Sequence, residues 1–317
     1  MWWHRIGARL ASAAEHIRVP GWARTVLGVL ILVTILGFFA GRAGQTLDTV
    51  RQAWQPVSWL YLALSFVTLL ICLLILALAW YGLLRTLGGR LPLPVALRFY
   101  GLTLLPRYVP GMVWGYAGRT LLCEREGVPR KVAAGSAVVE VGLIVGTGVI
   151  VAATNYLSHG WIVLLTSLPG LILLFGFLLA WATHQRRWAT RLTRAATWYG
   201  WGLVYIGFWL LYGASSWLVV LSVAPGIRLS SAPDVVVSAT VAWLAGFLVV
   251  LVPGGLGVRE GVFVLTLTPI IGPAGGTFVP LIARLIGMAS EAVFSVLCVL
   301  LLRDNRHAPV EHHGDKV

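Results

Sequence analysis

The tripeptide VPG occurs twice in this chain, within RYVPG at 107–111 and within VPGG at 252–255. Each copy ends an apolar run and is followed by an arginine, Arg119 or Arg259. A glutamate inside the next apolar run then follows each arginine. Helix breakers and charges at membrane depth are tolerated where the backbone lines a cavity or packs inside protein. The repeat therefore predicts two broken segments that contribute to one shared site.

The composition places the chain among integral membrane proteins. Hydrophobic residues make up 58% of its 317 residues and charged residues only 11%, against roughly 25% in a soluble domain. The formal net charge of +13 comes from arginines near the ends of apolar runs, a distribution typical of cytoplasmic loops that face anionic headgroups. Nucleic-acid-binding proteins carry a stripe of basic and aromatic residues on a soluble fold. This sequence has no such stripe, so no nucleic-acid partner is expected.

Apolar runs of about 20 residues predict the membrane spans. Six full spans are expected, at residues 22–41, 57–84, 132–156, 161–183, 200–224 and 278–302. Two further apolar stretches, 95–122 and 235–271, are interrupted at 106–111 and 253–257. The run 95–105 would rise about 16 Å as helix, roughly half of the hydrocarbon core, so a re-entrant hairpin is expected. The predicted fold class is all-α, a polytopic membrane helical bundle with six full spans plus two re-entrant broken-helix hairpins.

Basic residues assign the two sides of the membrane. They crowd the segment before residue 22, both flanks of the first interrupted stretch, the connection 184–199 and the segment after residue 302. These parts, with both termini, are predicted to be cytoplasmic. The first hairpin then enters from inside and the second from outside, which makes the halves an inverted repeat with its site at the broken helices. An eight-span count is the alternative, because the 18 apolar residues at 235–252 could cross alone.

The expected organisation has three parts: a basic N-terminal cytoplasmic segment at 1–21, a transmembrane domain at 22–302 and a polar C-terminal tail at 303–317. The expected location is the cell membrane, with multiple passes. The connection 184–199 has basic residues on one helical face and apolar residues on another. An amphipathic helix lying in the cytoplasmic interface is therefore expected there.

Two glutamates, Glu140 and Glu291, lie inside predicted spans. Each would cost about 2.5 to 3.5 kcal/mol if left alone in a bilayer, so a partner is expected, with Arg119, Arg259 and Arg284 as candidates. One interpretation is that the pairs tie broken helices to neighbouring spans. The other is that the arginines hold an anionic substrate group while the glutamates orient them, beside free N–H groups at the starts of the broken helices.

The candidate substrate-binding residues come from both broken segments and from the spans that follow them. They are Arg107, Tyr108, Pro110, Gly111, Arg119, Glu140, Pro253, Gly254, Gly257, Arg259, Glu260, Arg284 and Glu291. No catalytic residue, metal or cofactor is expected. The three cysteines lack paired spacing, and the seven histidines lie at termini or connections.

The two broken segments carry a family resemblance. The first reads PRYVPG at 106–111, followed by Trp114-Gly115, Gly118-Arg119 and Glu140, and the second reads PGGLGVREG at 253–261. Together they resemble the transmembrane, flippase-like region of the lysylphosphatidylglycerol synthase family, over about residues 25 to 302. The resemblance implies a domain that, in bifunctional members, moves aminoacylated phosphatidylglycerol between leaflets. Those members continue into a soluble aminoacyl-transferase domain, whereas this chain ends at Val317, so lysyltransferase activity is not expected.

These observations predict a lipid translocase. It would move an anionic or modified phospholipid, or a lipid-linked headgroup, through a central site at the two broken helices. Two alternatives remain: an accessory membrane subunit of a glycosyltransferase or lipid-modifying system, and a proton-coupled small-solute carrier with Glu140 and Glu291 as proton sites. The expected partners are membrane lipids, anionic phospholipids above all, and a glycosyltransferase or lipid-modifying enzyme for the accessory role.

Overall fold

The computed structural model describes residues 57–108, 114–153, 186–249 and 253–301. Every regular element in these ranges is helical, and five helices there are long and apolar enough to cross a membrane. The chain is therefore a polytopic helical membrane bundle, as its composition predicts. The expected spans at 22–41 and 161–183, and both terminal segments, lie outside the described residues.

Helices α3 (Trp59–Thr86) and α8 (Arg186–Val223) form an extensive helix pair in the bundle. The Ser65 hydroxyl donates to the Ser215 carbonyl oxygen at 3.0 Å, and the two hydroxyl oxygens lie 2.9 Å apart. Near the other end of α3, any side chain at Gly82 would overlap the Trp201 indole of α8. Small residues and hydroxyl bonds of this kind hold membrane helices together, because burial from lipid supplies little driving force.

Helix α8 corrects one prediction. The segment 184–199 is predicted to form a separate interfacial helix, but residues from Arg186 onward belong to the same unbroken helix as the span. No proline or glycine occurs between Arg186 and Tyr199. Nothing in this stretch therefore ends the helix before it reaches the apolar run.

The first interrupted stretch folds as a hairpin of α4 (Leu93–Leu102), the 3-10 turn η1 (Leu105–Tyr108) and α5 (Trp114–Arg125). Helix α4 begins after Pro92, with another proline in its first turn, where a missing N–H costs nothing. A Cβ at Gly115 would lie 2.6 Å from the Thr103 carbonyl oxygen. Glycine at this position thus lets the first described turn of α5 pack directly against the end of α4.

Helix α6 (Arg130–Ala153) follows a turn in which Gly127 has a φ of 80°. It packs against α8 through Gly148, where a Cβ would lie 2.7 Å from the Trp209 ring. The Trp209 indole donates to the Ile144 carbonyl oxygen at 3.1 Å. These contacts fix the helix that carries Glu140 against the α3–α8 pair.

The second interrupted stretch forms α9 (Ala232–Leu248), preceded by η2 (Leu229–Ser231) and followed by η3 (Pro253–Gly255) and α10 (Val258–Leu301). Gly254, Gly255 and Gly257 have φ values of 58°, 65° and 79°, a region that favours glycine. A second break divides α10 at Gly272, with φ 79° and ψ 171°. Because helix resumes at once after Gly272, the last helix starts earlier than the predicted 278.

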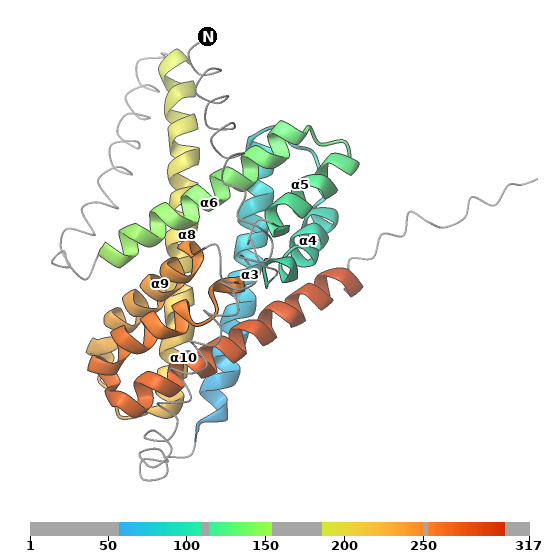
Figure 1. Cartoon of the computed structure of the whole chain (residues 1–317). Coiled ribbons are helices and arrows are strands. Elements are labelled where there is room, and N and C mark those ends of the chain that lie inside the picture. Colours follow the sequence, from blue (N-terminus) through green and yellow to red (C-terminus); the bar gives the residue numbers. More distant parts are fainter. Residues whose placement is uncertain (1–56, 109–113, 154–185, 250–252, 302–317) are drawn as a thin grey trace, which may run out of the picture. The chain divides into compact units, whose positions relative to one another are not determined.

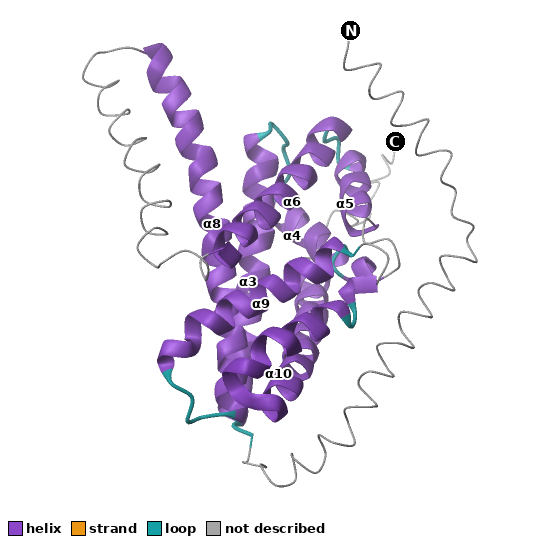
Figure 2. Ribbon diagram, turned by 60° about the vertical axis from the view of Figure 1, so that its left-hand side comes forward, coloured by secondary structure: helices purple, strands orange, loops and turns teal. Residues whose placement is uncertain are grey.

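The two hairpins approach each other from opposite ends of the bundle. Figures 1 and 2 place the α3–α4 and α5–α6 turns at the upper end and the α8–α9 turn at the lower end. The tips η1 and η3 are in contact. This is the mirrored arrangement that an inverted repeat requires. The segment Leu229–Leu248 is long enough to cross a membrane, as the eight-span alternative requires, but the chain reverses directly after it.

Candidate functional site

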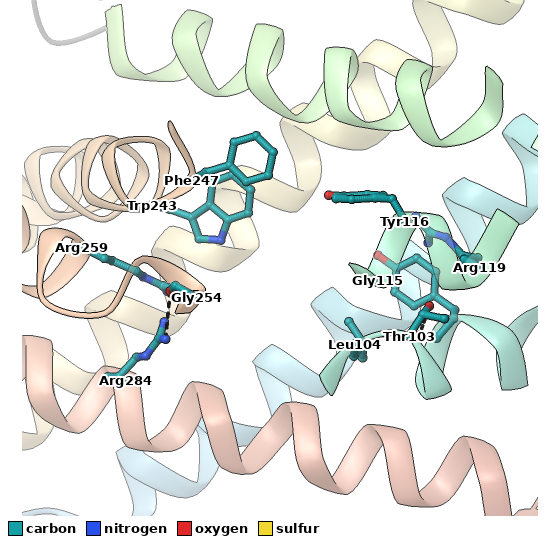
Figure 3. Close-up of a pocket in the computed structure, with 12 residues that line it drawn as sticks. Thr103, Leu104, Gly115, Tyr116, Arg119, Trp243, Phe247, Gly254, Arg259 and Arg284 are labelled. Atoms are coloured by element: carbon teal, nitrogen blue, oxygen red, sulfur yellow. Dashed lines mark hydrogen bonds between the residues drawn. The ribbon is translucent and has the colours of Figure 1, made fainter. Parts of the chain in front are cut away.

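A cavity with about 740 Å³ of empty space, counted together with the space at its mouth, lies between the two hairpins. Its walls come from α4, α5, α9, η3 and α10, including the tip of the second hairpin. Figure 3 shows Tyr116 and Arg119 on one side of this cavity and Arg259 and Arg284 on the other. We call it the hairpin pocket. The lining residues are Tyr100, Thr103, Leu104, Gly115, Tyr116, Arg119, Trp243, Gly246, Phe247, Gly254, Arg259 and Arg284.

Arg119 is held in a cage of aromatic rings. Its guanidinium carbon lies 4.5 Å from the Trp80 ring centroid, 4.7 Å from that of Tyr100 and 5.4 Å from that of Tyr116. Its Nη2 donates to Glu140 Oε2, and the Tyr100 hydroxyl donates to Glu140 Oε1 at 3.3 Å. Arg119 and Glu140 are 5% and 1% exposed. Both carboxylate oxygens of Glu140 are thus engaged, and Arg119 joins α5 to α6.

Glu260 and Arg284 form a second charged pair, which shapes the tip of the second hairpin. Glu260 Oε2 accepts a hydrogen bond from the Gly257 N–H, three residues earlier. This is one half of a capping box, in which a glutamate in the first turn satisfies an orphan N–H of its own helix. Arg284 Nε lies 3.4 Å from Glu260 Oε1, and Arg284 Nη2 donates to the Gly254 carbonyl oxygen at 3.0 Å. One arginine therefore holds both ends of the glycine turn.

Arg259 contacts a tyrosine, whereas Arg119 and Arg284 each pair with a glutamate. It donates to the Tyr212 hydroxyl, and its guanidinium carbon lies 5.4 Å from the Tyr212 ring centroid. Among the described residues, no carboxylate lies within ion-pair distance of Arg259. Its backbone is pressed against α9, because a Cβ at Gly246 would lie 2.9 Å from the Arg259 Cβ. The Arg259 guanidinium therefore lines the hairpin pocket with a charge that no described side chain neutralises.

A second cavity, enclosing about 580 Å³, shares Arg259 and Trp243 with the hairpin pocket. Its other polar walls include Ser215, Ser216, Ser290 and Glu291 from α8 and α10. Arg259 therefore stands between two chambers, one lined by further arginines and one by hydroxyls and a carboxylate.

The structure brings together most of the predicted site residues. Five of them line the two cavities directly: Arg119, Gly254, Arg259, Arg284 and Glu291. Glu140, Glu260 and Gly257 lie behind the walls of the hairpin pocket and hold them through hydrogen bonds. The pairing of Glu140 with Arg119 is as predicted, whereas Arg284 pairs with Glu260, a combination that the sequence analysis does not anticipate.

Five predicted residues lie in or beside the two hairpin tips. The backbones of Arg107 and Tyr108 belong to η1, and that of Pro253 to η3, without described side chains. Pro110 and Gly111 lie outside the described residues altogether. The turns η1 and η3, which carry Arg107, Tyr108 and Pro253, are in contact with each other.

Sequence reasoning missed the aromatic walls. Trp243 and Phe247 are four residues apart on α9 and stack with centroids 5.1 Å apart and an interplanar angle of 10°. Tyr116 and Tyr212, which contact Arg119 and Arg259, were not candidates either. The signal was present in part, because an aromatic pair at helical i,i+4 spacing immediately precedes the second VPG tripeptide.

The fold and the pocket define a class of protein: a polytopic helical membrane protein whose two broken hairpins meet at a charged cavity. A family model described as the lysylphosphatidylglycerol synthase TM region matches residues 25–293. The chain belongs to this family and is a membrane protein of lipid-related function. Neither a curated protein nor a solved structure matches the chain significantly.

Proposed function

We propose that the protein translocates an anionic lipid headgroup between leaflets through the hairpin pocket. The observation that carries the proposal is the convergence of Arg119, Arg259 and Arg284, from both broken hairpins, on one cavity in a helical membrane bundle. Charges at this depth are costly unless they are paired or serve a pathway. Guanidinium groups grip phosphate oxygens with planar, two-pronged hydrogen bonds, so a lipid phosphate is a suitable occupant.

The broken helices add a second source of positive potential. Helix α10 begins at Val258, and Arg259 in its first turn lines the pocket, as do Gly115 and Tyr116 in the first described turn of α5. The first N–H groups of a helix carry partial positive charge and bind anions. In α10 the Gly257 N–H is already bound by Glu260, so the arginines supply most of the attraction there.

A lipid also needs room for its acyl chains. An apolar groove with about 720 Å³ of empty space lies between α3 and α10 and is lined by Val67, Leu70, Ile71, Leu74, Phe294, Leu297 and Cys298. The second cavity is built on neighbouring turns of the same two helices, with Leu73 from α3 and Glu291 from α10 among its walls. In the proposed mechanism the headgroup moves past Arg259 between the two chambers while the acyl chains stay in lipid along this groove.

The test is headgroup translocation in proteoliposomes. Vesicles containing purified protein and a headgroup-labelled phosphatidylglycerol should expose inner-leaflet label faster than protein-free vesicles. Arg259→Ala should return the rate toward that of protein-free vesicles, whereas Gly261→Ala should not, because no described atom beyond its own turn of helix lies within 4 Å of the added Cβ. A wild-type rate equal to that of empty vesicles would refute the proposal and leave the accessory-subunit alternative.

A further inference from the structure

The second cavity is lined by one cation and one carboxylate, Arg259 and Glu291. Both belong to α10, on either side of its break at Gly272, and Glu291 is 9% exposed. These two described side chains are not within ion-pair distance of each other, but they share the cavity. Opposite charges attract beyond contact distance where water is scarce. The positive charge of Arg259 therefore stabilises the ionised form of Glu291.

The other residues that line this cavity add no second cation. The remaining titratable side chains among them are Cys72 from α3 and Tyr212 from α8, and neither a thiol nor a phenol carries a positive charge. Helix α9 contributes no titratable side chain to the cavity. Helix α4 also packs against α10, but its Arg98 does not line the cavity. Arg259 is thus the counter-charge that faces Glu291 among the lining residues.

The serines of the cavity offer hydrogen-bond acceptors. The Ser216 hydroxyl donates to a backbone carbonyl oxygen of its own helix at 3.2 Å, and the Ser290 hydroxyl does the same at 2.8 Å. The Ser215 hydroxyl is engaged with Ser65 across the α3–α8 pair. A hydroxyl group whose proton is used in this way can still accept a hydrogen bond. These oxygens can accept from a protonated Glu291 carboxyl group, so the cavity can hold this side chain in its neutral form.

A lipid phosphate bound to Arg259 would compete with Glu291 for the same positive charge, because Arg259 lines both cavities. The phosphate brings a negative charge that neutralises the guanidinium. The buried Glu291 carboxylate would then lack its counter-charge, a state that is costly unless the carboxylate takes up a proton. Binding of the phosphate and binding of the proton are therefore linked, and each strengthens the other.

We propose that Glu291 is a proton-binding site and that one lipid phosphate and one proton bind the two cavities together. The proposal rests on the proposed headgroup site at Arg259 and adds an energy source to it. A phosphate that moves with a proton carries no net charge across the bilayer, and a proton gradient then drives the movement. Glu140 does not have this role, because Arg119 and Tyr100 engage both of its carboxylate oxygens.

The experiment measures equilibrium binding of phosphatidylglycerol to the full-length protein, in nanodiscs of a zwitterionic carrier lipid, between about pH 5 and pH 8. The phosphodiester of the probe stays ionised over this range, so a change in affinity reports on the protein. The affinity should rise as the pH falls, by up to about tenfold per pH unit if one proton binds with each lipid. A pH-indicator dye in weakly buffered solution should show the matching proton uptake. An affinity that is constant over this range, or that depends on sodium instead, would overturn the proposal.

Variants assign the proton to Glu291. Glu291→Gln cannot ionise, so it should bind phosphatidylglycerol at neutral pH as tightly as the wild type does at acidic pH, without proton uptake. Glu291→Asp keeps a carboxyl group and should retain the pH dependence. Glu126→Gln, which removes an exposed carboxylate from the turn between α5 and α6, is the matched control and should behave like the wild type. A wild-type pH dependence in folded Glu291→Gln would contradict the proposal.

Two further results keep the coupling separate from folding and from transport. Arg259→Gln removes the charge for which Glu291 and the phosphate compete, so it should lose lipid-dependent proton uptake even where some lipid still binds. Uptake that persists in this variant would contradict the proposal. Proton-linked binding without headgroup movement in proteoliposomes would refute translocation alone, and headgroup movement without any linked proton would refute the coupling alone.

Discussion

The Arg119 guanidinium donates a hydrogen bond to the Glu140 carboxylate within a cage of three aromatic rings. The contact joins α5, the second arm of the first hairpin, to the span α6. It also places the guanidinium on the wall of the hairpin pocket. Arg119 therefore both holds the first hairpin in place and contributes positive charge to the site. Different substitutions can test these two roles separately.

Breaking this pair should destabilise the protein. Glu140→Ala leaves a buried guanidinium without its counter-charge, which typically costs about 3 to 5 kcal/mol. The expected result is a clear loss of folded protein, seen as a lower Tm in detergent and a lower yield after size-exclusion chromatography. The paired change Arg119→Met with Glu140→Leu removes both charges and should recover much of the stability. A wild-type Tm for Glu140→Ala would show that the pair does not hold the hairpin.

Glu291 should respond differently to a similar loss of charge. It lines the second cavity with Arg259, Ser215 and Ser216. Glu291→Gln keeps the shape and hydrogen-bonding capacity of the side chain, so folded yield should stay near that of the wild type. Headgroup translocation should nevertheless fall several-fold, because the second cavity on the proposed headgroup path loses a negative charge. Normal transport with normal yield would exclude a role for this carboxylate.

The tip of the second hairpin should not tolerate a side chain at Gly246. An added Cβ would lie 2.9 Å from the Arg259 Cβ and 3.5 Å from the Gly255 carbonyl oxygen, so α9 and the tip must move apart. Gly246→Ala should reduce translocation about tenfold or more, since displacement of a binding group by about 1 Å costs rate in preorganised sites. Gly261→Ala, on the following helix with open space around it, is the matched control. Equal rates for the two variants would show that the position of Arg259 is not critical.

If the two hairpins enter from opposite sides of the membrane, the turns next to them should also lie on opposite sides. Cys123 is fully buried, so reporters belong in the exposed turns, at Glu126 between α5 and α6 and at Gly226 between α8 and α9. In a background without Cys72, Cys123 and Cys298, Glu126→Cys should be labelled from the cytoplasmic side by an impermeant maleimide. Gly226→Cys should be labelled from the other side. Labelling of both from one side would remove the inverted arrangement.

The sequence predicted the elements whose signals are local. The apolar run at 57–84 became α3, and the two interrupted stretches became the hairpins α4–α5 and α9–α10, because proline and glycine end helices. The sequence also predicted a break between 271 and 278, but in the structure this break is confined to Gly272, because Pro269, Pro273 and Pro280 are all accommodated in helix. Helix continuity across 186–199 was also missed, because amphipathicity alone does not end a helix.

Partner choice within the site could be predicted only in part. A buried glutamate needs a cation, and Arg119 was a candidate for Glu140 on that ground. The sequence could not reveal that Glu260 caps its own helix and thereby draws Arg284 to the tip. Nor could it bring Tyr212 to Arg259, or the Trp243–Phe247 stack to the pocket, because those contacts depend on how distant helices pack.

The central claim is that both broken hairpins bind one ligand, and a double-mutant cycle tests it most directly. Arg119→Lys and Arg259→Lys each keep a positive charge but lose the planar fork that grips phosphate, so each should slow phosphatidylglycerol translocation in proteoliposomes. Rates are normalised to folded protein. If the residues share one headgroup, the combined effect should differ from the product of the single effects by about threefold or more. Single effects that multiply to within about twofold would mean that the two arginines serve separate sites and would contradict the account.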